Sequence, residues 1–333
     1  MAVGVKDVAA AAGVSVGTVS NVLNQPEKVA PATVEKVQRV IDELGFVRND
    51  AARQLRAGRS RSVGLIVLDI GNPFFAQVAR GAEARAQEAG LSVLMGSSDE
   101  STERESRYLD LFREQRVNGV LVTPVDEGRA AYARLAAAGV PVVLLDRDAP
   151  DGVLGSVSVD DVEGGHLAAA HLLELGRRAL AFVGGPDSLR QVADRLEGAR
   201  RAVRGFADAR LEVVGVPALS VLSGREAGER IAARSREDWP DAIFCANDLV
   251  AVGILQAFAL TGAVRVPEDI ALIGYDDIDF AAAAVVPLTS VRQPAWQMGY
   301  TAVDMLLRDP DDVQVERRVR YRPELAVRTS TTG

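Results

Sequence analysis

Apolar residues in the first 44 positions recur at helical spacing, and they predict three short helices. These helices are expected from about Lys6 to Ala12, from Val16 to Asn24 and from Pro31 to Leu44. Gly13 can adopt the positive φ that ends the first helix, and Ser15 can cap the second. Two helices joined by so tight a turn predict a helix-turn-helix, whose second helix lies in the major groove of DNA. A plain helical hairpin is the alternative interpretation.

From residue 62 onward, fully apolar strands alternate with amphipathic helices. Strands are expected at residues 62–69, 91–97, 119–125 and 141–146, and then in a second set at 180–185, 211–216, 242–247 and 271–276. This alternation predicts parallel sheets with helices on both faces. Two such sets predict two Rossmann-like lobes, and ligands of this architecture bind at the carboxyl ends of the strands.

The composition is that of an ordinary globular protein. A chain of 333 residues is long enough for two or three domains, and 48% apolar with 25% charged residues is typical. Cys245 is the single cysteine and can form no internal disulfide, which fits a reducing compartment. No signal peptide and no apolar stretch of about 20 residues is visible, so we expect a cytoplasmic protein without a membrane partner.

The net charge of −8 is distributed unevenly. Residues 1–61 hold nine Lys and Arg and six Asp and Glu, a charge of +3, so that the remainder carries −11. A basic head on an acidic body indicates that only the head meets a polyanion. A solvated charged linker would produce the same imbalance.

Two stretches carry a family resemblance that extends over essentially the whole chain. KDVAAAAGVSVGTVSNVLN (residues 6–24) and ARQLRAGRSRSVGLIV (residues 52–67) resemble the DNA-reading helices and the hinge helix of the LacI/GalR family of bacterial transcriptional regulators. The resemblance implies an N-terminal all-α helix-turn-helix head plus an α/β periplasmic-binding-protein-like (type I) ligand domain of two Rossmann-like lobes. The ligand domain is similar to that of ribose repressors.

The resemblance also implies domain bounds. We expect a helix-turn-helix domain at residues 1–48 and a hinge helix with its linker at 49–61. The N-terminal lobe of the ligand domain would comprise residues 62–160 and 292–322. The C-terminal lobe would comprise residues 161–291 and 323–333, so that the chain crosses between the lobes near Asp160, Val291 and Arg322.

DNA contacts follow from the family pattern, position by position. Val16, Gly17 and Asn21 lie where the family reads bases, while Ser15, Thr18, Ser20 and Asn24 would mostly touch phosphates. In the hinge, the matching positions are Asn49, Ala52, Leu55 and Arg56. A leucine at the position of Leu55 wedges into the minor groove and kinks the operator in this family. The alternative is that Leu55 merely packs under the ligand domain.

Polar and aromatic residues collect where the predicted strands end. They are Asn72, Phe74, Phe75, Asp146, Arg147, Arg195, Asn247, Asp276 and Gln293. Carboxylates and amides accept the hydrogen bonds of sugar hydroxyls, arginine and asparagine donate, and aromatic rings cover the sugar face. By resemblance, the two phenylalanines would cover the ring of a small effector and the others would bind its hydroxyls. Taken singly, each residue has an ordinary alternative as a helix cap or surface charge.

Two details bear on the identity of the effector. The family often has an aromatic residue near Leu219, so one ring face is expected to be covered less tightly here. Arg147 and Arg195 together could neutralise a phosphate, so both an aldose and its phosphate fit the sequence.

Enzyme and metal motifs are not visible. His166 and His171 are five residues apart and share no helix face well, and no Cys, Asp or Glu lies at metal-ligand spacing from them. Asp146 and Asp276 could form a glycosidase pair, but a DNA-reading head argues against an enzyme. We therefore expect no catalytic residues, no metal and no cofactor.

The sequence thus predicts a homodimeric repressor that binds a palindromic, double-stranded operator and is controlled by a pentose or ribose-like sugar in the cleft between the lobes. No heptad tail for a tetramer is visible. Whether the effector releases DNA or acts as a corepressor stays open. Alternatives are a catabolite-control-type regulator with a protein, nucleoside or sugar-phosphate effector, and a sugar-binding transport protein.

Overall fold

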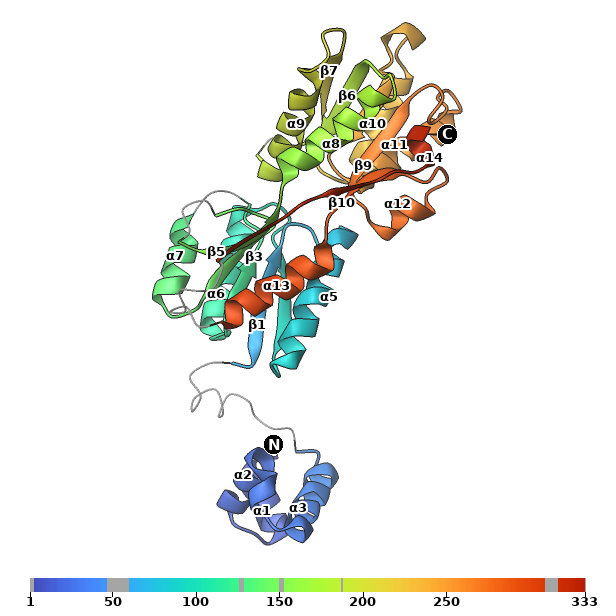
Figure 1. Ribbon diagram of the computed structural model, residues 1–333. Coiled ribbons are helices and arrows are strands. Elements are labelled where there is room, and N and C mark those ends of the chain that lie inside the picture. The colour runs from blue at the N-terminus through green and yellow to red at the C-terminus, as the bar shows by residue number, and fades with distance from the viewer. Residues whose placement is uncertain are drawn as a thin grey trace. The chain divides into compact units, whose positions relative to one another are not determined.

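The computed structural model describes residues 3–46, 60–125, 129–149, 153–186, 188–308 and 317–332 (Figure 1). The chain divides into two compact units, Met1–Ser60 and Arg61–Gly333. Among the residues described, no helix is long and apolar enough to cross a bilayer.

In its described residues, the smaller unit contains three α-helices, α1 (Val5–Ala12), α2 (Val16–Asn24) and α3 (Pro31–Leu44). Gly13 ends α1 with a φ of 62°. Helical spacing brings one apolar face of each helix together in a small core, whose fully buried members include Val8, Ala12, Val19 and Val37. The helix-turn-helix predicted from the sequence is therefore confirmed.

The larger unit contains two six-stranded sheets, one in each lobe (Figure 1). The N-terminal lobe holds, in sheet order, β11 (Arg318–Tyr321), β5 (Gly155–Val159), β4 (Val142–Leu145), β3 (Val120–Val122), β1 (Ser62–Val67) and β2 (Ser92–Ser97). The C-terminal lobe holds β12 (Glu324–Ala326), β10 (Thr289–Arg292), β9 (Ala271–Asp276), β8 (Ala242–Cys245), β6 (Ala179–Gly184) and β7 (Arg210–Gly215). All described pairs are parallel except β10 with β12.

Helices connect these strands and cover the sheets. They are α5 (Pro73–Glu88), α6 (Thr102–Glu114), α7 (Arg129–Ala137), α8 (Asp161–Glu174), α9 (Arg190–Val203), α10 (Val221–Ala232), α11 (Asp248–Thr261), α12 (Asp279–Ala283), α13 (Ala295–Leu307) and α14 (Thr329–Thr332). The strands β1, β3, β4, β6, β8 and β9 are almost wholly buried, as expected of parallel strands covered on both faces. The predicted fold class is confirmed.

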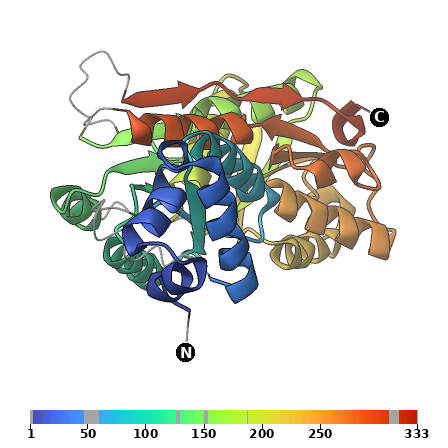
Figure 2. The same cartoon turned by 90° about the horizontal axis from the view of Figure 1, so that it is seen from below.

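The chain passes between the lobes at three connections. These follow β5, β10 and β11, and the last of them links β11 directly to β12 in the dark red ribbon that runs from one lobe into the other (Figures 1 and 2). The sequence pattern did not show β5, β11 and β12 as strands, because they are short and rich in polar residues. Both lobes belong to the same compact unit.

Close helix packing fixes the position of α9, which carries side chains of the candidate site. A Cβ on Gly165 of α8 would lie 1.9 Å from the carbonyl oxygen of Arg195, and one on Gly198 would lie 2.0 Å from that of Val162. Only glycine at these two crossings lets the backbones of α8 and α9 approach so closely. Arg195 is thereby held against the first turn of α8.

Candidate functional site

Seven of the nine predicted effector residues line one cavity of about 240 Å³ between the lobes, the effector cavity. They are Asn72, Phe74, Phe75, Asp146, Arg195, Asn247 and Asp276. They come from the carboxyl ends of β1, β4, β8 and β9 and from α9, as the rule for open α/β sheets requires. Arg147 instead lines a neighbouring cavity. Gln293 lines a further cavity and contacts Asp276.

Asp276, at the end of β9, joins several of these residues. Asn72, from the other lobe, donates from Nδ2 to its Oδ2 at 3.0 Å, and Gln293 donates from Nε2 to its Oδ1 at 2.8 Å. Burial raises the pKa of the Asp276 carboxyl, and the Arg195 charge and the two amides oppose that rise. Gln293 thus acts on Asp276 rather than lining the effector cavity.

Arg195 is almost fully buried and rigidly held. Its Nε donates to Oδ1 of Asp161 at 2.8 Å and its Nη1 donates to the carbonyl oxygen of Ala246 at 2.7 Å. The guanidinium also lies 3.7 Å from the ring centroid of Tyr275. Burial lowers the pKa of Arg195, but neighbouring carboxylates, Asp161 foremost, outweigh that effect and raise it overall. The group is therefore a fixed positive charge in the wall of the cavity.

A second link between the lobes joins Asp146 to Gln191, a residue that the sequence analysis did not select. Gln191 Nε2 donates to the main-chain oxygen and to Oδ2 of Asp146, both at 3.0 Å. Burial and then the negative charge of Asp161 raise the pKa of Asp146 to about 7, against the opposing effects of Arg195 and Gln191. Gln191 precedes Arg195 by four residues, so the helical repeat could have placed it on the same face of α9.

The apolar wall of the effector cavity contains Phe74 and Phe75, whose rings meet edge to face with centroids 5.0 Å apart. Both phenylalanines are buried, and Leu219 faces the same cavity. Asn72 and Asn247 cap α5 and α11 through their Oδ1 atoms, which accept from the main-chain N–H of Phe74 and of Val250 at 3.0 Å. These two asparagines therefore cap helices as well as line the effector cavity.

Three further acidic residues, Asp69, Asp99 and Glu100, line the effector cavity and were missed in the sequence. They follow β1 and β2, so the strand-end rule could have identified them. Burial, followed by the charges of Asp69 and Asp99, raises the pKa of Glu100. Among the described residues that line the cavity, five carry carboxyl groups and one, Arg195, carries a guanidinium.

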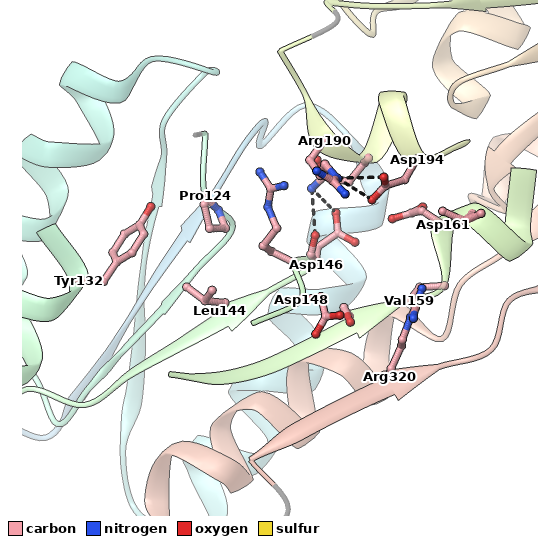
Figure 3. A pocket seen from close by; sticks show the side chains of 14 residues that line it. Pro124, Tyr132, Leu144, Asp146, Asp148, Val159, Asp161, Arg190, Asp194 and Arg320 are labelled. Carbon is pink, nitrogen blue, oxygen red and sulfur yellow. Dashed lines mark hydrogen bonds and ion pairs between the residues drawn. The ribbon is translucent and has the colours of Figure 1, made fainter. Parts of the chain in front are cut away.

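The neighbouring cavity, here the second cavity, measures about 330 Å³ and shares Asp146 and Gln191 with the effector cavity. Figure 3 shows Asp146 and Asp148 at the end of β4, opposite Arg190 and Asp194 of α9. Arg190 Nε donates to Asp194 at 2.9 Å. Arg147 belongs to the lining of this cavity. Within the described ranges, no group of three or more His, Cys, Asp or Glu side chains is placed to hold a metal ion.

The predicted DNA-reading residues lie on α2 and its cap. Ser15 Oγ accepts from the main-chain N–H of Thr18 at 3.0 Å and caps the helix. Val16, Gly17, Asn21 and Asn24 are exposed, whereas Thr18 and Ser20 are partly buried. The three residues that are expected to contact DNA bases, Val16, Gly17 and Asn21, are therefore all exposed on α2. Asn49, Ala52, Leu55 and Arg56 lie outside the described residues.

Residues 4–49 match the family described as bacterial regulatory proteins, lacI family, and residues 169–331 match the periplasmic binding protein-like domain. The transcriptional regulator DegA of Bacillus subtilis is 32% identical, with 98% of this chain and 97% of the relative covered. The transcriptional repressor PurR of Aliivibrio fischeri is 34% identical over 98% of this chain and 97% of its own length.

Solved structures agree with these matches. A Lac repressor dimer bound to operator and the anti-inducer ONPF superposes with a TM-score of 0.85 at 29% identity, covering both chains fully. A complex of the transcriptional regulator CelR with cellobiose has a TM-score of 0.71 at 31% identity, covering 98% and 99% of the two chains. A LacI family regulator of Enterococcus faecium with bound ribose has a TM-score of 0.73 at 27% identity, covering 81% of this chain and 98% of its own.

Proposed function

The chain belongs to the lacI family of bacterial regulatory proteins and is a DNA-binding transcriptional repressor of that family, and from this premise we propose how it is controlled. It acts in the cytoplasm as a homodimer on a palindromic operator. A small neutral sugar of the pentose type binds between Phe74, Phe75 and Asp276 in the effector cavity and releases the operator.

The observation that carries this proposal is the pair of hydrogen bonds that cross between the lobes. Asn72 reaches Asp276, and Gln191 reaches Asp146, on the lining of the same cavity. Sugar hydroxyls are donors and would compete for, or add to, these bonds at both carboxylates. Any ligand that does so changes the relative stability of the open and closed lobes, and a ligand acts on an equilibrium only through such a difference.

The effector cavity favours an uncharged ligand over a sugar phosphate. In the described lining, five carboxyl groups face one guanidinium, and this group, on Arg195, is already bonded to Asp161 and to the carbonyl oxygen of Ala246. Arg147, which the sequence paired with Arg195 as a phosphate site, lines the second cavity instead. The ribose carried by the Enterococcus regulator supports a pentose, and the cellobiose carried by CelR supports a larger sugar.

On the DNA side, Val16 and Gly17 offer no side-chain hydrogen bonds, and Val16 is 43% exposed. We assign them to apolar contacts such as thymine methyl groups, with Asn21 as the hydrogen-bonding reader. The same proposal includes a hinge at residues 49–61 and a minor-groove wedge at Leu55. It also includes phosphate contacts by Ser15, Thr18, Ser20 and Asn24. Closure of the lobes would change the spacing of the two hinge helices in the dimer.

The test combines operator selection with a ligand screen. Purified protein is used to select its operator from a random duplex library, and affinity is then measured by fluorescence anisotropy with and without ribose, xylose, arabinose, ribose 5-phosphate and adenosine. A thermal melt on the same panel reports binding, because a ligand at about 100 times its dissociation constant stabilises by about 2.7 kcal/mol. Stabilisation by a pentose together with weaker operator binding is expected. A response to the phosphate or the nucleoside alone would favour the catabolite-type alternative.

A further inference from the structure

Polar atoms in the second cavity are left without partners in the protein. Four of them line it, namely Oδ1 of Asp146, Oδ1 of Asp148, Oγ of Ser158 and Oε1 of Gln191. Asp146, Ser158 and Gln191 are only 5%, 3% and 6% exposed. Buried polar atoms in folded proteins are nearly always hydrogen-bonded, so this concentration indicates a binding surface. Oδ1 of Asp148 and Oε1 of Gln191 are acceptors, and Oδ1 of Asp146 accepts when its carboxyl group is ionised, so a ligand here must donate hydrogen bonds.

Gln191 illustrates this requirement most directly. Its amide nitrogen is occupied by two hydrogen bonds to Asp146, and its amide oxygen has none. The carboxylate of Asp146 accepts from that nitrogen through Oδ2 and leaves Oδ1 unpartnered. At the Asp146–Gln191 pair, which lines both cavities, Oε1 of Gln191 therefore remains an acceptor, and Oδ1 of Asp146 accepts when ionised and donates when protonated.

The charges around the second cavity do not favour an anion or a cation. Arg190 is bonded to Asp194, Arg320 to Asp160 at 2.8 Å, and Arg318, outside the lining, to Asp148. The positive charge of Arg147, which also lines the cavity, acts on Asp194. Guanidinium groups paired in this way have little capacity left for a phosphate. Pro124, Leu144 and Val159 add apolar contact area. A neutral, hydroxyl-rich group with an apolar face, such as a sugar ring, meets all of these conditions.

We propose that the second cavity binds a second sugar unit of the effector, so that the ligand is a neutral glycoside of two units with one unit in each cavity. The linkage between the units passes the Asp146–Gln191 pair, whose unpartnered oxygens accept from its neighbouring hydroxyls. The two cavities measure about 240 and 330 Å³, and their combined volume lies within the range of about 300–1,000 Å³ for ligand pockets. The inference rests on the proposed sugar-responsive function, with the pentose-type ring as one unit.

Ser158 provides the sharpest test because its hydroxyl has no partner in the protein to lose. Dissociation constants are measured by isothermal titration calorimetry for ribose, xylose, glucose and galactose, and for xylobiose, cellobiose, lactose and maltose. The wild type is compared with Ser158→Ala, which removes the hydroxyl, and Ser158→Val, which fills the cavity. Ser156→Ala is the control, since Ser156 lies on the same strand, is equally buried and lines neither cavity.

We expect at least one disaccharide to bind about tenfold tighter than its component monosaccharide. Ser158→Ala should weaken that disaccharide about fivefold, the typical effect of one lost hydrogen bond, and Ser158→Val should remove the advantage altogether. Monosaccharide affinities should change less than twofold in both variants, and Ser156→Ala should change neither affinity.

Equal binding of mono- and disaccharides, or a disaccharide advantage that survives Ser158→Val, would overturn the two-unit effector and leave the sugar-responsive repressor intact. Absence of binding by every saccharide would overturn both the sugar effector and this inference. Operator affinity of the unliganded protein, measured in parallel, reports the repressor function independently of either result.

Discussion

Asn72 and Asp276 belong to different lobes and meet through a hydrogen bond of 3.0 Å, with both side chains buried. The Asp146–Gln191 contact makes a second such link at the same cavity. An effector that binds these carboxylates would therefore act where the two lobes are hydrogen-bonded to each other. This arrangement gives a direct physical route from ligand binding to lobe closure.

Replacing Asp276 by alanine should abolish the effector response while operator binding is retained. The change removes the carboxylate that Asn72 and Gln293 contact and leaves the α2 surface untouched. We expect effector affinity to fall more than a hundredfold, and operator affinity without effector to change less than threefold. Calorimetry and fluorescence anisotropy measure the two quantities, and an intact response would remove Asp276 from the site.

The buried ion pair of Asp161 and Arg195 should be costly to break. Both side chains are less than 10% exposed, so Asp161→Ala leaves the buried charge of Arg195 with a longer contact of 3.9 Å to Asp276 in place of its closest ion pair. We expect a loss of about 3–5 kcal/mol in the free energy of unfolding. The exposed pair of Arg225 and Glu229 is the control, because Glu229→Ala should cost no more than about 1 kcal/mol. Urea denaturation of the two variants measures both values, and similar losses would contradict the assignment.

Asp146 should make the protein less stable as pH rises toward neutrality. Its pKa is raised to about 7, so the folded state holds a proton that the unfolded state has released above its ordinary value of 3.8. The stabilisation is therefore fully present below about pH 3.8 and is lost as the pH rises through about 7. Asp146→Asn cannot titrate, and its melting temperature should fall less than that of the wild type between pH 5 and 7.5. Parallel curves would show that Asp146 is ionised throughout this range.

Much of this architecture could be predicted from local sequence patterns. The features that could not be predicted have physical causes. Parallel strands buried on both faces read as apolar runs, and their carboxyl ends place Asn72, Asp146 and Asp276 together. Gln191 and the position of Arg147 depend instead on how the lobes face each other. That relation is set by tertiary contacts far apart in sequence, such as the glycine crossing of α8 and α9.

Leu55→Ala should weaken operator binding without changing effector affinity. Leu55 lies outside the described residues, and the prediction follows from its proposed role as a minor-groove wedge. An inserted side chain offsets the cost of unstacking a base step by the contacts that the bent duplex permits. We expect at least a tenfold loss of operator affinity by anisotropy, together with reduced DNA bending in a circular-permutation gel assay. Unchanged bending would show that Leu55 packs elsewhere.

Ser15→Ala should reduce operator affinity by loosening the start of α2. The Ser15 hydroxyl accepts from the main-chain N–H of Thr18, and loss of such a cap typically costs about 0.5–2 kcal/mol. The helix has only nine residues, so fraying at its start displaces Val16 and Gly17, which face outward. Ser15→Asn preserves a capping side chain and should retain most of the affinity, which separates capping from a direct phosphate contact. Ser101→Ala removes an equivalent cap from α6 in the larger unit and should leave operator binding unchanged. Equal losses of operator affinity in the Ser15→Ala and Ser15→Asn variants would instead assign the effect to the serine hydroxyl on DNA.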